Sequence, residues 1–433
     1  MEKGKTAVGF LSPQPYMTLA MEKMRENYDV HVLEPRTWDD AEMDDIAAYC
    51  RQNGIVSVGG FAQKDAFHHI LINERLSNPV PSRLAFFYCM NKYLMRTLEP
   101  DPFFFAPVDP LHESDEQIAA KFDEWPAMLK NTSLSLGKGI YKITNEKELK
   151  EVLDTYRRDR GLQELIAGQY GSYLKGVDPE KVPQTAPPFM VEHLVDMNVA
   201  VEYCYEGYVT QDGEVVHYAL TEEIYFSNHQ ALGYVTPPIS IGRQTAKKIE
   251  EWVNVYMGRF AELGYRNQFF NLEFWIMPDG AIRLTEINPR AAHSYHYNYL
   301  YSFGNSLYED NLLLARGDEP SRHNPWNKWC KGEDHSYTLI VLITGKDMDR
   351  VADILDYDYV EHLERDEGIL IRHNRQREDV LTEHDMTAAG VMLLQIWVVG
   401  KTREDVIRKE HEIRARIYKK PPRDSVYPAY WDV

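Results

Sequence analysis

The segment Asn267–Arg290, NQFFNLEFWIMPDGAIRLTEINPR, holds the residues whose types and spacing best suit chemistry. Two strand-like runs flank an Asp-Gly dipeptide at 279–280, which is a strong signal for a two-residue hairpin turn. With that dipeptide as the turn, Glu273 lies directly opposite Glu286. Side chains alternate along a strand, so both carboxylates are expected on one face of the hairpin.

Directly opposed residues have Cβ atoms about 4.5–5.5 Å apart, and like charges in such a pair are destabilising. The same register sets Asn271 opposite Asn288, on the face that carries the two acids. Carboxylate and amide oxygens suit Mg²⁺ or Mn²⁺ better than Zn²⁺. Arg290 follows closely enough to contact anionic groups held by such ions. Two alternatives stay open: a solvated acidic hairpin, and a β-bulge that shifts the pairing and removes the argument.

The elements that position this hairpin begin with alternating strand and helix patterns in the first hundred residues. This alternation predicts a parallel sheet wound with helices. The turn after the first strand, SPQP, carries no GxGxxG, so a dinucleotide fingerprint is absent. Strands are expected at 6–11, 29–34 and 55–58, and helices at 16–27, 41–52 and 64–76.

A second region with strands and helices follows, and it leads into a large β-rich region at 189–288. Residues 161–188, with GQYG, DPEK and APP, are expected to be rich in loops. A smaller final part is expected to contain strands and a closing charged helix. In the second region we expect strands at 127–130 and 140–143 and a helix at 146–158, and in the β-rich region a helix at 245–263. In the final part we expect strands at 337–344, 368–372 and 391–399 and a helix at 404–418.

Composition excludes several classes of function. The chain has 433 residues and a net charge of −19, so general binding to nucleic acid or an anionic membrane is not expected. No apolar run approaches the ~20 residues of a membrane span, and the N-terminus does not read as a secretory signal. The four cysteines lie far apart, without metal-ligand or disulfide spacing. We therefore expect a soluble, cytoplasmic protein.

The hairpin resembles the metal-binding strands of the ATP-grasp superfamily, which place metals on a Glu from one strand and a Glu-x-Asn from the next. The matching residues are Glu273, Glu286 and Asn288, followed by Arg290. The resemblance implies that ATP and Mg²⁺ are bound, with Mn²⁺ as the alternative ion. It covers roughly residues 85–315.

Upstream elements fall in the order that the superfamily uses. Lys92 and Lys130 match its two nucleotide lysines, and SLSLGKG matches its mobile phosphate loop. Hydroxyls and free backbone N–H groups in such a loop suit phosphate oxygens. Without this context, a loop with a lysine and glycines is more commonly an ordinary surface loop. The loop residues that the resemblance assigns to ATP are Ser133, Ser135, Gly137, Lys138 and Gly139.

FMVEHLVDMNVAVEY resembles the hinge strand that holds adenine. Glu192, His193 and Val195 stand at the positions that meet the base, and Glu202 at the position of an acid near the ribose or phosphates. Taken alone, these residues would read as an amphipathic strand pair with exposed acids.

His293 and His296 follow the metal strand and lie three residues apart. Either histidine could contact substrate or act as a base near neutral pH. Packing within the surrounding Tyr-rich segment is the favoured interpretation. With Arg290 and Lys130, His293 is kept as a candidate catalytic residue.

The resemblance implies a multidomain fold that mixes α/β and α+β parts. We expect an N-terminal doubly wound parallel-sheet domain (1–110), a small ATP-grasp lobe with the phosphate loop (111–195), a large lobe with the metal site (196–320) and a small C-terminal α+β domain (332–433). The phosphate loop has no long glycine run, which makes a biotin carboxylase less favoured. The Tyr- and His-rich segment after Arg290 prevents transfer of family substrate preferences.

Within the superfamily, the pattern most resembles carboxylate–amine ligases of the L-amino acid ligase type. The implied function is ligation of a small carboxylic acid, for which an amino acid is one option, to an amine. It would proceed through an acyl phosphate and release ADP and phosphate. The alternatives are an acid–thiol ligase, a carboxylase-type enzyme, or an ATP-binding sensor or scaffold without catalysis. Expected partners are the small carboxylate and amine substrates, and a second copy of the chain in a homodimer.

Overall fold

The computed structural model describes residues 4–134, 139–184, 186–196, 198–386, 390–420 and 425–431, except for the side chains of 63 and 64. Strands in these ranges form a three-stranded, a four-stranded and an eight-stranded sheet. The expected class, a multidomain protein with a parallel N-terminal sheet and mixed α and β parts, is confirmed. In the described part of the chain, no helix has the length and apolarity needed to cross a membrane.

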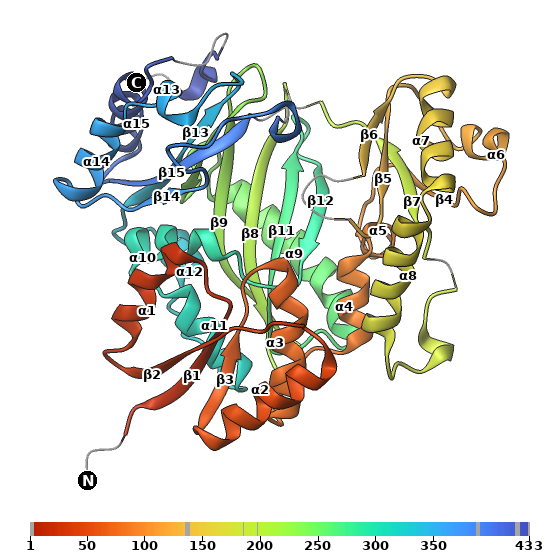
Figure 1. Ribbon diagram of the computed structural model, residues 1–433, viewed down its shortest axis with the longest axis horizontal. Coiled ribbons are helices and arrows are strands. Elements are labelled where there is room, and N and C mark those ends of the chain that lie inside the picture. The colour runs from red at the N-terminus through yellow and green to blue at the C-terminus, as the bar shows by residue number, and fades with distance from the viewer. Residues whose placement is uncertain are drawn as a thin grey trace.

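The N-terminal sheet is parallel, with strand order β2-β1-β3, as the alternating pattern predicts. Helices lie against it in Figure 1. Its strands are β1 (Thr6–Leu11), β2 (Tyr28–Leu33) and β3 (Ile55–Gly59), and its helices are α1 (Thr18–Met24), α2 (Asp40–Gln52) and α3 (Gln63–Arg75). The next two helices, α4 (Arg83–Met90) and α5 (Lys92–Thr97), contact β12 (Ile282–Asn288).

The second sheet is antiparallel, with order β4-β7-β5-β6, and forms a separate lobe on the right of Figure 1. Its strands are β4 (Phe105–Val108), β5 (Ala127–Asn131), β6 (Ile140–Ile143) and β7 (Phe189–His193). The associated helices are α6 (Asp115–Ala119), α7 (Glu146–Arg158) and α8 (Arg160–Leu174).

The prediction that 161–188 is rich in loops is wrong for its first half, which is α8. Asp159 caps this helix by accepting a hydrogen bond from the Leu162 amide at 2.9 Å. Tyr170 packs edge-on against Phe87, with ring centroids 5.0 Å apart. Packing of α8 against α4 therefore outweighs the low helix propensity of three glycines.

The eight-stranded sheet has the order β12-β11-β8-β9-β10-β13-β15-β14. The C-terminal strands continue this sheet, because β13 pairs with β10 through Gly233↔Val341 and the three following pairs. One hydrogen-bonded sheet thus contains strands from both sides of the domain boundary expected between residues 320 and 332. Its strands are β8 (Val201–Val209), β9 (Val215–Tyr225), β10 (Ala231–Thr236), β11 (Gln268–Ile276), β12 (Ile282–Asn288), β13 (Tyr337–Gly345), β14 (Ile371–His373) and β15 (Val391–Gly400).

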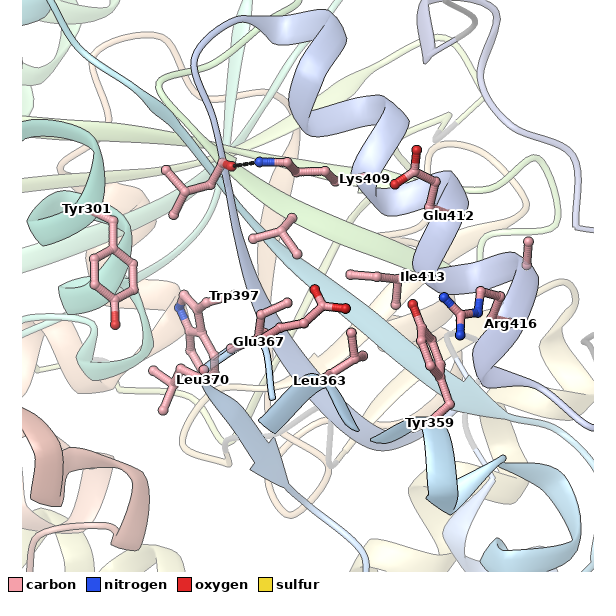
Figure 2. A pocket seen from close by; sticks show the side chains of 15 residues that line it. Tyr301, Tyr359, Leu363, Glu367, Leu370, Trp397, Lys409, Glu412, Ile413 and Arg416 are labelled. Carbon is pink, nitrogen blue, oxygen red and sulfur yellow. Dashed lines mark hydrogen bonds between the residues drawn. The ribbon is translucent and has the colours of Figure 1, made fainter. Parts of the chain in front are cut away.

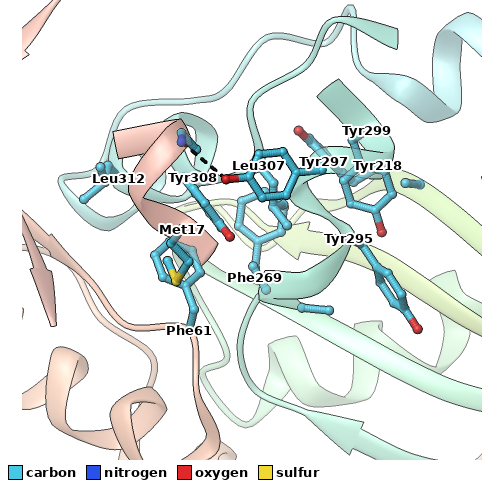
Figure 3. Close-up of a cluster of buried hydrophobic side chains, with 14 of the residues drawn as sticks. Met17, Phe61, Tyr218, Phe269, Tyr295, Tyr297, Tyr299, Leu307, Tyr308 and Leu312 are labelled. Carbon is cyan, nitrogen blue, oxygen red and sulfur yellow. Dashed lines mark hydrogen bonds between the residues drawn. The ribbon is translucent and has the colours of Figure 1, made fainter. Parts of the chain in front are cut away.

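Helices cover both faces of this sheet. A hydrophobic core beside the sheet contains the tyrosines of the segment after Arg290. These tyrosines pack with residues from the N-terminal part of the chain, such as Met17 and Phe61 (Figure 3). The α-helices are α9 (Arg243–Glu262), α10 (His296–Phe303), α11 (Leu307–Ala315), α12 (Pro325–Lys331), α13 (Val351–Ile354), α14 (Tyr357–Arg365) and α15 (Arg403–Ile417). Short 3₁₀ turns occur at η1 (Pro15–Met17), η2 (Pro179–Lys181), η3 (His293–Tyr295), η4 (Glu383–Asp385) and η5 (Ala429–Trp431).

Candidate functional site

The hairpin of β11 and β12 opposes the two carboxylates as the sequence predicts. Glu273 pairs with Glu286, and Asn271 pairs with Asn288. The route to this register differs from the expected one. The turn is one residue longer, because the Met277 amide donates to the Ala281 carbonyl, and a bulge between Glu273 and Phe274 restores the pairing.

Asn288 joins the two acids. Its Nδ2 donates to Glu273 Oε1 at 3.1 Å and to Glu286 Oε1 at 3.4 Å. Arg290 donates from Nη2 to Asn288 Oδ1 at 3.4 Å, so the arginine lies beside the group. In the described part of the chain, no three His, Cys, Asp or Glu side chains gather into a metal cluster. The candidate metal site is therefore two carboxylates and an amide.

The electrostatics of the group are unfavourable without a cation. Burial, followed by the charge of Glu286, raises the pKa of Glu273 well above its ordinary value. Two more acids on the same face, Glu202 and Glu223, add to that shift. They pair across β8 and β9, and Tyr225 donates from its hydroxyl to both, at 2.7 and 3.0 Å.

Sequence reasoning missed Glu223 and Glu206. Strand alternation in HYALTEEIY would have placed Glu223 on the face of Tyr225, but the pairing of β9 with β8 is not readable locally. Glu206 accepts from the Ala292 amide at 2.9 Å and from the Tyr299 hydroxyl at 3.1 Å. It thereby fixes the chain just after Arg290.

Lys92 reaches the carboxylates from the start of α5. Its Nζ lies 3.5 Å from Glu286 Oε2 and donates to the Leu134 carbonyl at 2.7 Å. Asn91 caps the helix by accepting from two backbone amides. Lys92 thus connects the candidate metal site with the beginning of the predicted phosphate loop.

The described ends of the predicted phosphate loop are held by Asn131. Its Oδ1 accepts from the backbone amides of Ser133 and Leu134 at 3.0 and 3.1 Å, and its backbone N–H donates to the Gly139 carbonyl at 2.7 Å. Gly139 has φ +70°, and a Cβ there would approach the Asn131 side chain to 2.7 Å. Ser135, Gly137 and Lys138 lie outside the described residues.

Lys130 stands near the end of β5, where a strand-end lysine is predicted. It forms an ion pair with Glu192, and Glu192 also accepts from Arg96 Nη2 at 2.7 Å. Lys130 and Arg96 together lower the pKa of the Glu192 carboxyl, against the effect of burial. Arg96 was not singled out from the sequence, because its partners lie far along the chain.

The predicted adenine residues line one small pocket. Glu192, His193 and Val195 border about 120 Å³ of space together with Lys130, and Leu284 and Trp275 form part of its wall. The side chain of His193 turns toward Asp123, with 3.0 Å between Nε2 and Oδ1. Which of these residues contact a nucleotide stays a prediction.

Of the two histidines after the metal strand, His296 is packed, as the favoured interpretation predicts, and His293 is partly buried. Burial lowers the pKa of His293 to about 4 and that of His296 to about 3. The His293 ring bonds to the Tyr16 hydroxyl through Nδ1, and His296 stacks on Tyr308 with centroids 3.9 Å apart. Neither histidine titrates near neutral pH, which argues against a general base at these positions.

A cavity of about 510 Å³ adjoins the acidic face. Its lining includes Glu202, Glu223 and Tyr225 together with Tyr427 and Tyr430. It also reaches His229. The lining of the cavity therefore combines acidic and aromatic side chains.

A larger cavity of about 810 Å³ lies among the C-terminal elements. Figure 2 shows Trp397 and Tyr301 beside it, with Tyr359 and Arg416 farther along. Its lining contains none of the carboxylates or lysines described above. Cavity size alone thus does not identify the candidate site.

Known proteins resemble this chain in fold. Residues 124–296 match the family model of an ATP-grasp domain. No curated protein matches the chain by sequence. An L-amino acid ligase from Bacillus licheniformis has a similar structure, with a TM-score of 0.67 at 13% identity over 98% of this chain and 100% of that one.

Two further solved structures resemble the chain. Phosphoribosylglycinamide synthetase from Anaerococcus prevotii has a TM-score of 0.60 at 14% identity, over 96% of this chain and 100% of that one. N5-carboxyaminoimidazole synthetase from Staphylococcus aureus, complexed with ADP, has a TM-score of 0.62 at 15% identity, over 96% and 98%. At these identities the likeness establishes the fold.

Proposed function

We propose that this chain, whose residues 124–296 form an ATP-grasp domain within the fold of ATP-grasp ligases, is an ATP-dependent ligase. It joins a small carboxylic acid to an amine and releases ADP and phosphate. The observation that carries the proposal is the opposed pair Glu273 and Glu286, bridged by Asn288 and faced by Lys92.

The donor set of this group fits Mg²⁺ or Mn²⁺. Glu273, Glu286 and Asn288 offer oxygen ligands, and burial together with the neighbouring carboxylates raises the pKa of Glu273 although Arg290 opposes that shift. These three residues would hold the ion. When bound, it would neutralise phosphate charge and polarise a phosphoryl oxygen.

The chain's own cations would act on the phosphates. Lys92 lies between Glu286 and the start of the phosphate loop, where it would hold the terminal phosphates of ATP. Lys130 borders the small pocket and would contact the nucleotide beside it. Arg290 would neutralise the charge that develops on the transferred phosphoryl group.

The reaction then has two steps, phosphoryl transfer to the acid and amide formation. A carboxylate oxygen of the acid forms a bond to the γ-phosphorus, and the bond from that phosphorus to the ADP oxygen breaks. The bound ammonium group would first give a proton to Glu202 or Glu223, whose raised pKa values favour accepting it. The neutral amine nitrogen next attacks the acyl carbon, the carbon–oxygen bond to phosphate breaks, and the nitrogen loses its second proton to the released phosphate. The Ser133–Gly139 loop would exclude water from the acyl phosphate.

The 510 Å³ cavity supports an amine as the acceptor. Glu202 and Glu223 in its lining would favour a cationic ammonium group, and its aromatic side chains would accommodate an apolar substituent. A volume of this size suits a small molecule. The cavity adjoins the acidic face, which is where an acyl phosphate would form.

The proposal is tested by incubating the protein with ATP, Mg²⁺ and a panel of carboxylic acids, with hydroxylamine present as the amine. We expect acid-dependent release of ADP and phosphate together with a hydroxamate. AMP and pyrophosphate would contradict the mechanism, because they indicate adenylation. ATP binding without turnover on any acid of a broad panel would favour a nucleotide-binding protein without chemistry.

A further inference from the structure

Arg372 on β14 is a half-buried cation without an anionic partner in the described structure. It makes no ion pair there, and its one hydrogen bond to a side chain goes from Nη1 to the neutral Gln395 Oε1 at 3.3 Å. Two more deeply buried arginines, Arg96 and Arg414, are both paired with glutamates. Arg372 differs from them in lacking a countercharge.

The environment of Arg372 disfavours its charge. Burial lowers the pKa of its guanidinium, and Tyr308 opposes that effect only in part. The guanidinium carbon lies 4.6 Å from the centre of the Tyr16 ring, which offers only a modest cation–π attraction. A bound anion would supply the missing countercharge and form charge-assisted hydrogen bonds with the guanidinium fork.

His293 adds a second donor beside Arg372. Its Nδ1 bonds to the Tyr16 hydroxyl, and the charge of Arg372 contributes to its lowered pKa, so the two groups are close. At neutral pH the imidazole is uncharged. When Tyr16 donates to Nδ1, the ring proton is on Nε2, which has no hydrogen-bond partner among the described side chains and backbone groups.

The three residues come from distant parts of the chain. Tyr16 belongs to η1, His293 to η3 and Arg372 to β14, so only the folded molecule brings them together. Tyr308 holds His293 in place, because its hydroxyl donates a hydrogen bond to the His293 carbonyl at 2.8 Å. The group is thus held by packing and is not a chance approach of flexible surface side chains.

This group lies within the reach of a small substrate from the proposed reaction centre. His293 follows Arg290 by three residues, which span at most about 11 Å between Cα atoms. The backbone between them is fixed by Glu206 at the Ala292 amide. A molecule of amino-acid size at Arg290 could therefore place a second group near His293.

We propose that Arg372, His293 and Tyr16 form a binding site for a free carboxylate of a small substrate, one that is not itself phosphorylated. The inference rests on the proposed ligase function and narrows its substrates. The carboxylate belongs either to an amino-acid acceptor or to a dicarboxylic acid donor. A bidentate guanidinium–carboxylate pair, with a donor from His293, is the chemistry that both sources share.

The test compares substrates that differ only by this carboxylate. Alanine is compared with ethylamine as the acceptor, and succinate with propionate as the acid, in wild type, Arg372→Gln, Arg372→Lys and the control Arg365→Gln. Arg365 is exposed and paired with its neighbour Asp366. Binding of each carboxylate is also measured by ligand-observed NMR, which needs no turnover.

We expect wild type to prefer either alanine over ethylamine or succinate over propionate at least tenfold in kcat/KM. The pair that shows this preference tells whether the bound carboxylate belongs to the acceptor or to the acid. Arg372→Gln should lose that preference and bind the same carboxylate at least tenfold more weakly, with the KM for ATP unchanged. Arg372→Lys should keep part of the preference, and Arg365→Gln all of it. Equal preference and equal NMR binding in Arg372→Gln and wild type would overturn the proposal.

The two proposals fail in different ways. Carboxylate binding that depends on Arg372 in a protein that turns over no substrate would remove the ligase function and keep the site. Ligation in which Arg372→Gln discriminates as wild type does would keep the function and remove the site. Circular dichroism and thermal unfolding of each variant exclude misfolding as the cause of a loss.

Discussion

Four carboxylates on one face of a sheet define the chemistry of this molecule at the scale of residues. Glu273 and Glu286 are bridged by Asn288, while Glu202 and Glu223 share the hydroxyl of Tyr225. Burial and mutual repulsion raise the pKa values of Glu202, Glu223 and Glu273. Such a group is stabilised by a divalent cation or by a cationic ligand, and the proposed reaction supplies both.

Replacement of Glu286 tests the carboxylate pair. Glu286→Gln keeps the size of the side chain but removes the charge that faces Lys92 and the proposed cation. We expect kcat for acid-dependent ADP release to fall at least about 100-fold, because the cation that would stabilise transition-state charge loses a ligand. The exposed Glu262 at the end of α9 gives the control, Glu262→Gln, which should retain wild-type activity. Near-normal ligation by Glu286→Gln would remove the assignment.

Asp310 predicts a pH-dependence of stability outside the site. Burial, then the charge of Glu309, raises its pKa to about 6 from 3.8, although Tyr218 donates to it at 2.6 Å. The folded state therefore binds the proton more tightly. Its contribution to stability is fully present below about pH 3.8 and is lost as the pH rises through 6.

Asp310→Asn cannot ionise, so its stability relative to wild type should increase between pH 5 and pH 8 by about 1.4 kcal/mol. Urea unfolding of both proteins at the two pH values measures this difference. Asp212→Asn, at an exposed turn, is the control. A stability difference between Asp310→Asn and wild type that is the same at both pH values would contradict the expected ionisation.

At the scale of elements, the hairpin shows how a correct prediction of strand pairing can follow from the wrong turn. A two-residue turn predicted the pairing of Glu273 with Glu286. The structure has a longer turn and a compensating bulge, so the two deviations cancel at the carboxylates. Turn chemistry is readable from the Asp-Gly dipeptide, but a bulge depends on packing of the finished sheet.

The phosphate-loop capping by Asn131 gives a prediction at this scale. Asn131→Ala removes the acceptor for the amides of Ser133 and Leu134. We expect the KM for ATP to rise about tenfold, since a 1.4 kcal/mol loss of loop order corresponds to that factor. Steady-state kinetics at saturating acid and amine measure it.

Asn145→Ala is the matched control, because Asn145 caps α7 in the same lobe by accepting from the Glu148 amide at 3.1 Å. It should reduce the free energy of unfolding by about 1 kcal/mol and leave the KM for ATP unchanged. Equal effects of both variants on KM would show that Asn131 acts only through the stability of the lobe.

At the scale of the whole molecule, the sequence predicts the parallel N-terminal sheet and most elements, since hydrophobic period and turn residues are local signals. It does not predict that α8 forms, because packing against α4 overrides three glycines. It also does not predict that Arg372 meets Tyr16 and His293, which only tertiary structure brings together. Contacts between residues that are far apart in the sequence cannot be predicted from local sequence patterns.

Continuity of the eight-stranded sheet predicts cooperative protection. β13 is hydrogen-bonded between β10 and β15, in the same sheet as the carboxylates. We expect hydrogen exchange of amides in β13 to be as slow as in β9, because opening either strand disrupts one shared core. Exchange of 337–345 in a separate, much faster step would indicate an independently unfolding C-terminal domain.

The most direct test of the central claim follows an oxygen atom. With the acid found by hydroxamate trapping, labelled with ¹⁸O in its carboxylate, the protein is allowed to form the amide, and the released phosphate is analysed by mass spectrometry. Attack of the carboxylate on the γ-phosphorus predicts one ¹⁸O in each phosphate and none in ADP. Unlabelled phosphate, or label in AMP, would contradict the acyl-phosphate mechanism.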